Sequence, residues 1–192
     1  MNGLYEIEAI RKYCDYIEEH LMNVEEAWAR LRESCGSMRF IYDDFVFWTI
    51  EGMMRGHDKS KTGSDEFTQY AEWFFGKYGK DYTPEENDDG IGAALHELAK
   101  DGFDKAWKHH KENNLHHWQS WTALEVVHHP YEKECHCVCM VADWMAMGVK
   151  FGDTAEEYYE AHKSEVKLPE WAVTFIGEIF EALRVHKESI KK

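Results

Sequence analysis

The chain has 192 residues, of which 44% are hydrophobic and 15% aromatic, and it carries a formal net charge of −15. This length and apolar content allow one well-filled core, so we expect residues 1–192 to form a single domain. The negative charge argues against binding to bulk nucleic acid or to anionic membranes, because like charges repel. An anionic substrate would need a bound cation or a local basic group in order to approach.

The cysteines and the first residues of the chain favour a cytoplasmic location. Five cysteines are an odd number, and three of them crowd into CHCVC at residues 135–139, which is a poor disulfide framework and suggests a reducing compartment. CHCVC also lacks the CxxC spacing of a zinc knuckle, so we interpret its cysteines as small helix residues. The opening MNGLYEIEAIRKY has no apolar signal-peptide segment, and no apolar run approaches the roughly 20 residues of a membrane span.

The first half of the chain shows a helical spacing of apolar residues. A line with alternating steps of three and four residues extends from Ile7 to Leu31 and predicts one long amphipathic helix. Further helices are expected at about residues 43–56 and from about Asp65 onward. The sequence GKDYTPEENDDGIG at residues 79–92 predicts a loop. This segment is the best candidate for a mobile lid or an insertion.

The second half continues the helical pattern. A helical region is predicted for residues 93–127 and should end at His128-His129-Pro130, because a residue before proline avoids the helical conformation. Another helix is expected over about residues 134–150, and Thr154 with Glu157 forms a capping box for the next. No strand pattern and no internal repeat competes. The predicted fold is therefore all-α, a compact bundle of about six to seven helices.

The sequence RGHDKSK places His57 and Asp58 side by side at the end of a predicted helix. Such a pair can bind one cation from two directions, and the carboxylate can bridge two ions. Lys61 lies near enough to meet a phosphate group. The alternative is an ordinary helix end, in which His57 interacts with the last carbonyl groups. However, His57 continues the inward stripe of Ile50 and Met54, and a buried histidine needs a partner.

Two more polar residues occupy apolar helix faces. His20 lies on the flank of the apolar stripe of the long first helix, and Asp143 lies within the otherwise apolar CMVADWMAMG. A lone aspartate in such a place needs a cation or several hydrogen-bond donors. The alternatives are a core histidine with a satisfied hydrogen bond and a structural salt bridge.

Residues 107–121 read WKHHKENNLHHWQSW and contain four histidines. In an unbroken helix, His110 and His117 lie on the core-facing line, so we expect both side chains to point inward. The residues expected to surround the ligands or to line a cleft are His109, His116 and Asn114. A break at Asn113-Asn114 would change this assignment, and the alternative is a polar, partly solvated helix face.

The order His20, His57-Asp58, Asp143 resembles the H…HD…D signature of the HD-domain superfamily of metal-dependent phosphohydrolases. HDKSK is similar to the HDxxK form common in that superfamily, which implies a phosphate-facing role for Lys61. More narrowly, EEHLMNVEEAW, HDKSK, SDEFTQYAEWFF, AWKHHKENNLHHWQSW and CMVADWMAM together resemble a family of uncharacterised phage and bacterial proteins that are regarded as HD-like. The chain lacks the GYP element of cyclic-dinucleotide phosphodiesterases, which argues against cyclic-di-GMP as the substrate.

This resemblance implies an HD-like helical domain that hydrolyses a nucleotide or another small phosphoester, with Asp58 and Lys61 as catalytic residues. The implied ligands of a first ion are His20, His57, Asp58 and Asp143, and those of a second are Asp58, His110 and His117. A divalent ion lowers the pKa of its water, so that the water can attack phosphorus near neutral pH. Histidine and carboxylate ligands suit one or two ions of Mn, Fe, Co, Ni or Zn.

Two other functions remain open. Some HD-fold proteins use a diiron pair for oxygenase chemistry, and such an enzyme would show no phosphatase activity. Alternatively, a phage or bacterial interaction protein could keep the metal only for stability. The sequence favours an open site, since the extra histidines and Lys61 exceed what one structural ion needs. Either a monomer or an oligomer is compatible with the sequence.

Overall fold

The computed structural model describes residues 2–84, 90–120 and 130–190, and in these residues the regular structure is helical throughout. They form eight α-helices and two short 3-10 helices, which confirms the all-α class and comes close to the predicted six to seven helices. The chain divides into two compact units. The first unit comprises Met1–Glu19 and Asp58–Asn114, and the second comprises His20–His57 and Leu115–Lys192. The expectation that residues 1–192 form a single domain stays a prediction.

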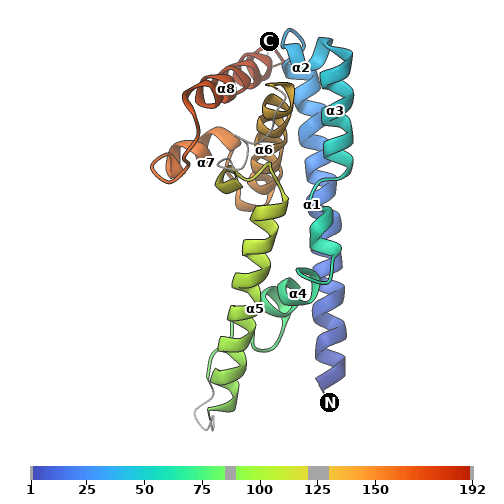
Figure 1. The fold of residues 1–192 in the computed structure, drawn as a ribbon, viewed down its shortest axis with the longest axis vertical. Coiled ribbons are helices and arrows are strands. Elements are labelled where there is room, and N and C mark those ends of the chain that lie inside the picture. Colours follow the sequence, from blue (N-terminus) through green and yellow to red (C-terminus); the bar gives the residue numbers. More distant parts are fainter. Residues whose placement is uncertain (1, 85–89, 121–129, 191–192) are drawn as a thin grey trace. The chain divides into compact units, whose positions relative to one another are not determined.

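The long first helix is confirmed as α1, which spans Asn2–Ser34 and contributes to both units (Figure 1). Its predicted apolar line is buried at Ile17, Val24 and Leu31. Ile7, at the start of that line, is exposed instead. The inward face of α1 is therefore best defined in the stretch that surrounds His20.

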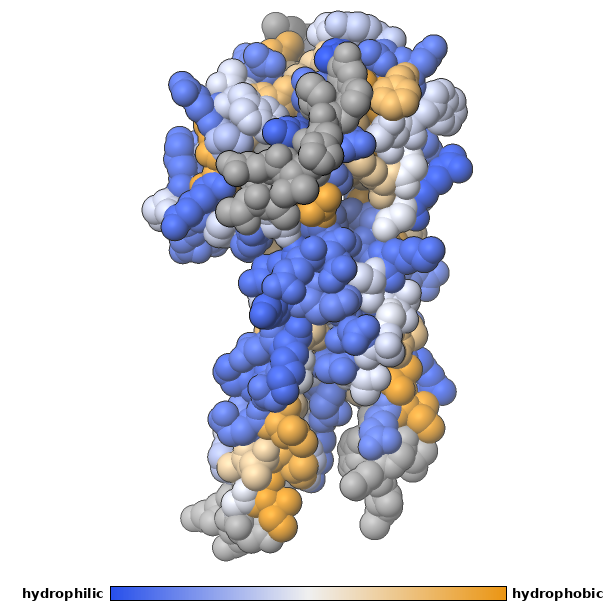
Figure 2. All heavy atoms as spheres, in the orientation of Figure 1, coloured by the Kyte–Doolittle hydropathy of each residue, from blue (hydrophilic) through white to orange (hydrophobic). Residues whose placement is uncertain are grey.

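The first unit contains η1 (Lys59–Thr62), α4 (Phe67–Phe75) and α5 (Ile91–Asn113) in addition to the beginning of α1. Helices α4 and α5 pack against each other (Figure 1). Their core is aromatic: it includes Tyr13, Tyr70 and Phe103, and the Tyr70 and Phe103 rings meet edge to face with centroids 5.7 Å apart. The surface of α5 is hydrophilic over its later turns and hydrophobic near its beginning, where Ile91 and Leu98 are exposed (Figure 2).

The second unit is organised around α6. It contains α2 (Arg39–Tyr42), α3 (Asp44–Arg55), η2 (Trp118–Ser120), α6 (Pro130–Phe151), α7 (Ala155–His162) and α8 (Glu170–Ile190). Helix α6 contacts α3, α7 and α8. Because it has neighbours on several sides, α6 is buried almost continuously from Cys137 to Ala146. All three cysteines of CHCVC lie in this core, which agrees with their interpretation as packing residues.

Several predicted details of the helix ends are confirmed. The Thr154 side chain accepts a hydrogen bond from the Glu157 N–H, and the Glu157 side chain accepts one from the Thr154 N–H, so the predicted capping box begins α7. The predicted loop at 79–92 is non-helical at residues 79–84, and α5 begins directly after Gly90. Residues 85–89 lie outside the described residues.

The unbroken helix predicted for residues 93–127 is interrupted after Asn113, and residues 121–127 of that prediction lie outside the described residues. Helix α5 ends at Asn113, and Asn114 has an extended backbone with φ −120° and ψ 98°. The Asn113 and Asn114 amides each donate a hydrogen bond to the carbonyl four residues earlier, at 2.8 Å. Such bonds offer the backbone an alternative to a continuing helix, so two consecutive asparagines favour a helix end. The predicted end at residues 128–130 involves residues outside the described ranges.

Within the part of the chain that the structure describes, no helix combines the length and the apolar character that crossing a membrane requires.

Candidate metal centre

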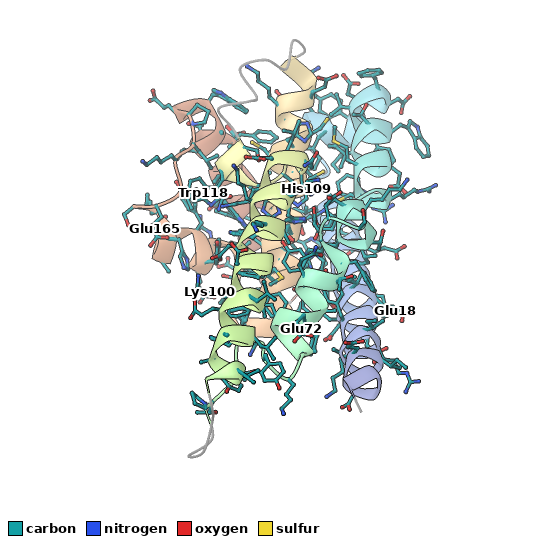
Figure 3. All side chains as sticks on the ribbon, turned by 60° about the horizontal axis from the view of Figure 1, so that its bottom comes forward. Glu18, Glu72, Lys100, His109, Trp118 and Glu165 are labelled. Atoms are coloured by element: carbon teal, nitrogen blue, oxygen red, sulfur yellow. The ribbon has the colours of Figure 1, made fainter. Side chains whose placement is uncertain are left out.

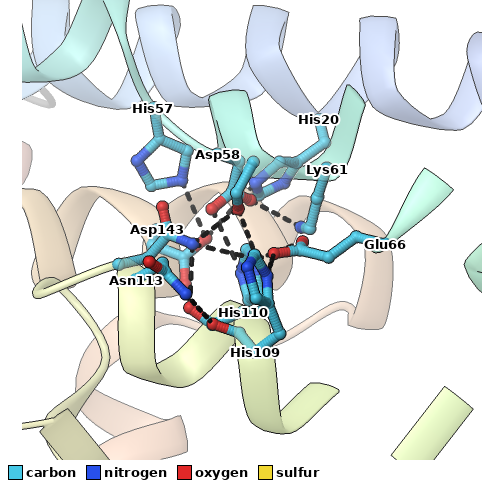
Figure 4. Close-up of polar contacts among 11 residues, drawn as sticks. His20, His57, Asp58, Lys61, Glu66, His109, His110, Asn113 and Asp143 are labelled. Carbon is cyan, nitrogen blue, oxygen red and sulfur yellow. Dashed lines mark hydrogen bonds and ion pairs between the residues drawn. The ribbon is translucent and has the colours of Figure 1, made fainter. Parts of the chain in front are cut away.

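Three of the predicted ligands converge within the second unit. His20 comes from α1, His57 from the turn after α3, and Asp143 from α6. The Nε2 atoms of His20 and His57 each lie 3.4 Å from Oδ1 of Asp143. Figure 4 shows the His57 ring directed at the Asp143 carboxylate. All three residues are buried, with exposed fractions of 4%, 4% and 9%.

Ordinary helix periodicity explains why His20 and Asp143 point inward. His20 lies three residues after Ile17 and four before Val24, both of which are buried, so it shares their face of α1. Asp143 lies three residues after Met140, within the most buried stretch of α6. The apolar packing of these helices thus brings two polar side chains into the interior.

The turn after α3 has an unusual backbone. Gly56 closes α3, and the His57 N–H donates to the Met54 carbonyl at 3.2 Å. Asp58 then adopts a left-handed conformation, with φ 53° and ψ 23°. It has the only positive φ of a non-glycine residue in the described ranges. That conformation costs roughly 1–2 kcal/mol for most residues, although aspartate tolerates it better.

The three side chains of the second unit fit a divalent metal ion. Four ligands held tetrahedrally at about 2.1 Å from an ion lie about 3.4 Å apart, which matches the observed separation of 3.4 Å between each Nε2 and Oδ1. The three ligand atoms all lie within 4.8 Å of one another. Three protein ligands with further positions open is the usual composition of a catalytic site. This buried His/Asp group can therefore hold a metal ion.

The charge of Asp143 suits this role. Burial alone would raise the pKa of its carboxyl, but the hydrogen bond and charge of His57, with the charges of His116 and His20, hold that pKa below its usual value. Asp143 thus stays ionised at neutral pH and can serve as an anionic ligand.

Two more histidines extend this group, which we call the second-unit cluster: His20, His57, His116, His117 and Asp143. The His116 ring stacks on the His57 ring, with centroids 4.2 Å apart and an angle of 28° between the planes. The His117 ring lies 4.4 Å from that of His116. His116 is buried, with 7% exposed. His116, which we expected only to surround the ligands, therefore packs directly on the predicted ligand His57. His117 lies beyond the end of α5, contrary to the predicted helix.

The first unit holds a second group, the first-unit cluster: Asp58, Lys61, Glu66, His109 and His110. Lys61 Nζ lies 2.5 Å from Oδ2 of Asp58, and His110 Nε2 lies 3.3 Å from Oδ1 of the same carboxylate. Asp58 and His110 are buried, with exposed fractions of 2% and 0%. The predicted pairing of Asp58 with His110 thus occurs within this unit (Figure 4).

Glu66, which precedes α4 and is fully buried, is a residue of the site that the sequence did not predict. Its two carboxylate oxygens lie 2.7 Å from His109 Nδ1 and 2.8 Å from His110 Nδ1. The segment SDEFTQY gave no local signal for this role, because the partners follow 43 and 44 residues later. His109 lies on α5, and Figure 3 labels it. The same figure labels Trp118, the first residue of the separate helix η2.

Asn114 also contributes in the first unit, in keeping with its expected place beside the ligands. Its amide donates to Ser60 Oγ at 2.7 Å, and Ser60 Oγ lies 3.2 Å from His110 Nδ1. These contacts link the end of α5 to η1 and hold the His110 ring in place.

Comparison with known proteins identifies a family. A search of curated proteins and a search of solved structures each found no match. The model of a family of unknown function, DUF5662, matches residues 9–183. The matched residues include both clusters and thus every predicted metal ligand. The chain therefore belongs to the DUF5662 family.

Proposed function

We propose that this protein is a metal-dependent phosphohydrolase that acts on a nucleotide or another small phosphoester. The observation that carries the proposal is the convergence of two histidine Nε2 atoms on the Asp143 carboxylate, each at 3.4 Å, in a buried setting. The H…HD…D order of the sequence adds the reaction class. When bound there, a divalent ion would supply a water of lowered pKa and positive charge against phosphoryl oxygens.

The residues of the second-unit cluster would have different roles. His20 and His57 would hold the ion through Nε2, and Asp143 would hold it through Oδ1. The stacked ring of His116 restricts rotation of His57, and so keeps its Nε2 directed at Asp143. Such preorganisation matters because a ligand that is already in place loses little entropy on binding.

The first-unit cluster would provide the remaining groups. Asp58 directly follows His57, so covalent geometry keeps the two α-carbons about 3.8 Å apart. Asp58 Oδ1 and His110 Nε2 lie 3.3 Å apart, a distance that is favourable when a proton or a cation lies between them. Lys61 adds positive charge, which would attract a phosphate to a chain with net charge −15. The sequence pattern assigns Asp58 and Lys61 to the reaction.

The first test is the metal content of protein purified without chelator, followed by a screen of nucleotides and phosphoesters with Mn, Co, Ni or Mg. We expect bound metal and hydrolysis, with both reduced in His57→Ala and hydrolysis lost in Asp58→Asn. The matched control is His186→Ala on α8, which should change neither.

Other results would point elsewhere. Bound iron with oxygen consumption and no phosphatase activity would favour the diiron oxygenase. A metal that only raises the melting temperature would favour the non-catalytic alternative. Metal-free protein, with His57→Ala unchanged in stability, would refute the metal site itself.

A further inference from the structure

Glu66 is a charged residue in an interior position. Its side chain is fully buried, and an ionised carboxylate in that setting is costly unless hydrogen bonds compensate. The compensation comes from two consecutive residues of α5: His109 Nδ1 lies 2.7 Å from Oε1, and His110 Nδ1 lies 2.8 Å from Oε2 (Figure 4). Each carboxylate oxygen of Glu66 thus contacts a different imidazole ring.

This arrangement determines where the protons of the two rings lie. An ionised carboxylate only accepts hydrogen bonds, so each ring must donate through Nδ1–H. Ser60 Oγ and Asn114 Nδ2 also approach His110 Nδ1, at 3.2 and 3.1 Å, but the carboxylate is nearer and charged. The two protons of the Asn114 amide have nearer acceptors in Ser60 Oγ and the His110 carbonyl, at 2.7 and 2.8 Å.

The proton on Nδ1 has a consequence at the opposite side of the His110 ring. A neutral imidazole with Nδ1–H carries its lone pair on Nε2. That Nε2 is the atom 3.3 Å from Oδ1 of Asp58. The buried carboxylate of Glu66 therefore turns the basic nitrogen of His110 toward Asp58. His109 is different, because 39% of its side chain is exposed and its contact in the cluster is to Glu66.

We propose that Glu66 is a positioning residue that sets the Nδ1–H form of His110 and so makes its Nε2 available, together with Asp58, to a divalent cation. A carboxylate that accepts from the second ring nitrogen fixes the orientation of a metal-binding histidine and raises its basicity. The cation part of this inference rests on the proposed phosphohydrolase function. The assignment of the proton does not.

Glu66→Gln tests the proposal with almost no change of shape. A carboxamide accepts at its oxygen but donates from its nitrogen, so it can accept from only one of the two rings. The other ring must then present a bare Nδ1 and carry its proton on Nε2. Asp65→Asn is the matched control, because Asp65 is the exposed neighbour in the same segment.

The first measurement is the protonation of each ring nitrogen by long-range proton–nitrogen NMR, on the full chain after removal of metal. His109→Ala assigns the signals. In the unmodified protein we expect a protonated Nδ1 on both His109 and His110, and in Glu66→Gln a bare Nδ1 on one of them. A bare Nδ1 on His110 in the unmodified protein would overturn the proposal, even if Glu66→Gln failed to fold.

The second measurement is the affinity for Mn²⁺ or Co²⁺ by calorimetry, with the melting temperature as a check on folding. We expect Glu66→Gln to weaken binding by about 10- to 100-fold and Asp65→Asn to leave it unchanged. Unchanged affinity in a folded Glu66→Gln variant would overturn the positioning role. If the unmodified protein bound no metal, the proposed function would fail, whereas the NMR result would still decide whether Glu66 sets the His110 proton.

Discussion

The two clusters use the same residue types but balance charge differently. The first-unit cluster has two carboxylates, and each contacts cationic or hydrogen-bond-donating partners: Lys61 for Asp58, and the two histidines for Glu66. The second-unit cluster has one carboxylate and four histidines, two of which direct Nε2 at the same oxygen. One cluster is thus an internally bonded network, whereas the other is a set of converging donors.

This difference separates a cluster whose side chains are already positioned by hydrogen bonds from one whose histidines converge on a single carboxylate oxygen. Hydrogen bonds already fix each side chain of the first-unit cluster, so it can hold Asp58 and His110 in defined positions. The second-unit cluster gains more stability from an added cation. The cation would balance the negative charge of Asp143 and would be coordinated by the lone pairs of the histidine nitrogens. Variants that affect the clusters unequally can test this comparison.

The largest effect is expected from Asp143→Asn. Removal of the charged ligand should lower the affinity for a divalent ion by about 100-fold or more, since even indirect contacts to ligands are worth 10- to 100-fold. Saturating metal should raise the melting temperature of the unmodified protein by about 5–10 °C and leave this variant unaffected. Calorimetry and thermal unfolding with and without chelator measure both quantities.

The control for that experiment is Glu178→Gln, which changes an exposed carboxylate on α8 of the same unit. It should bind metal as the unmodified protein does. If Asp143→Asn kept the full affinity, the second-unit cluster would not be the ligand set, and the contrast between the clusters would be lost.

A smaller effect should come from His136, which lies beside the second-unit cluster. Burial and, secondarily, the charge of His116 lower the pKa of His136 from 6.5 to about 4. The unfolded chain therefore binds more protons between these pH values, so this contribution to stability is complete above pH 6.5 and is lost as the pH falls toward 4. The free energy of unfolding should therefore fall by about 1–2 kcal/mol less in His136→Gln than in the unmodified protein over this pH range. The figure allows for the partial exposure of the ring.

The measurement is the free energy of unfolding in urea at pH 7.5 and pH 4.5 with metal removed. His186→Gln, which changes a half-buried histidine on α8, serves as the matched control for the same change of side chain. An equal loss of stability in His136→Gln would mean that the ring accepts a proton in the folded protein as readily as in the unfolded chain.

The smallest effect is expected in the first-unit cluster, from His109→Ala. It leaves one oxygen of Glu66 without its ring partner, but water can reach the space because the His109 side chain is 39% exposed. We expect a destabilisation of about 1 kcal/mol and nearly unchanged metal affinity. A loss of affinity as large as that of Glu66→Gln would show that both rings, and not His110 alone, transmit the effect of Glu66.

The sequence predicted the residues that periodicity governs. Helix spacing placed His20 and Asp143 on buried faces, and both converge on one group because their helices pack with those faces inward. It did not reveal Glu66, whose role depends on the packing of α4 against α5 rather than on a local pattern. The inward position predicted for His117 required an unbroken helix, whereas α5 ends at the two consecutive asparagines, the break that the sequence left as an alternative.

The left-handed backbone of Asp58 couples two requirements in a single residue. The position needs a carboxylate for its contacts and a residue that tolerates φ 53°. Substitution by alanine would remove the charge and also impose a steric cost, so its effect would mix two causes. Asparagine retains the tolerance and removes only the charge, whereas glycine removes the side chain but adds freedom to the unfolded chain. Few residue types can therefore occupy this turn, and only aspartate combines a short anionic side chain with the required backbone.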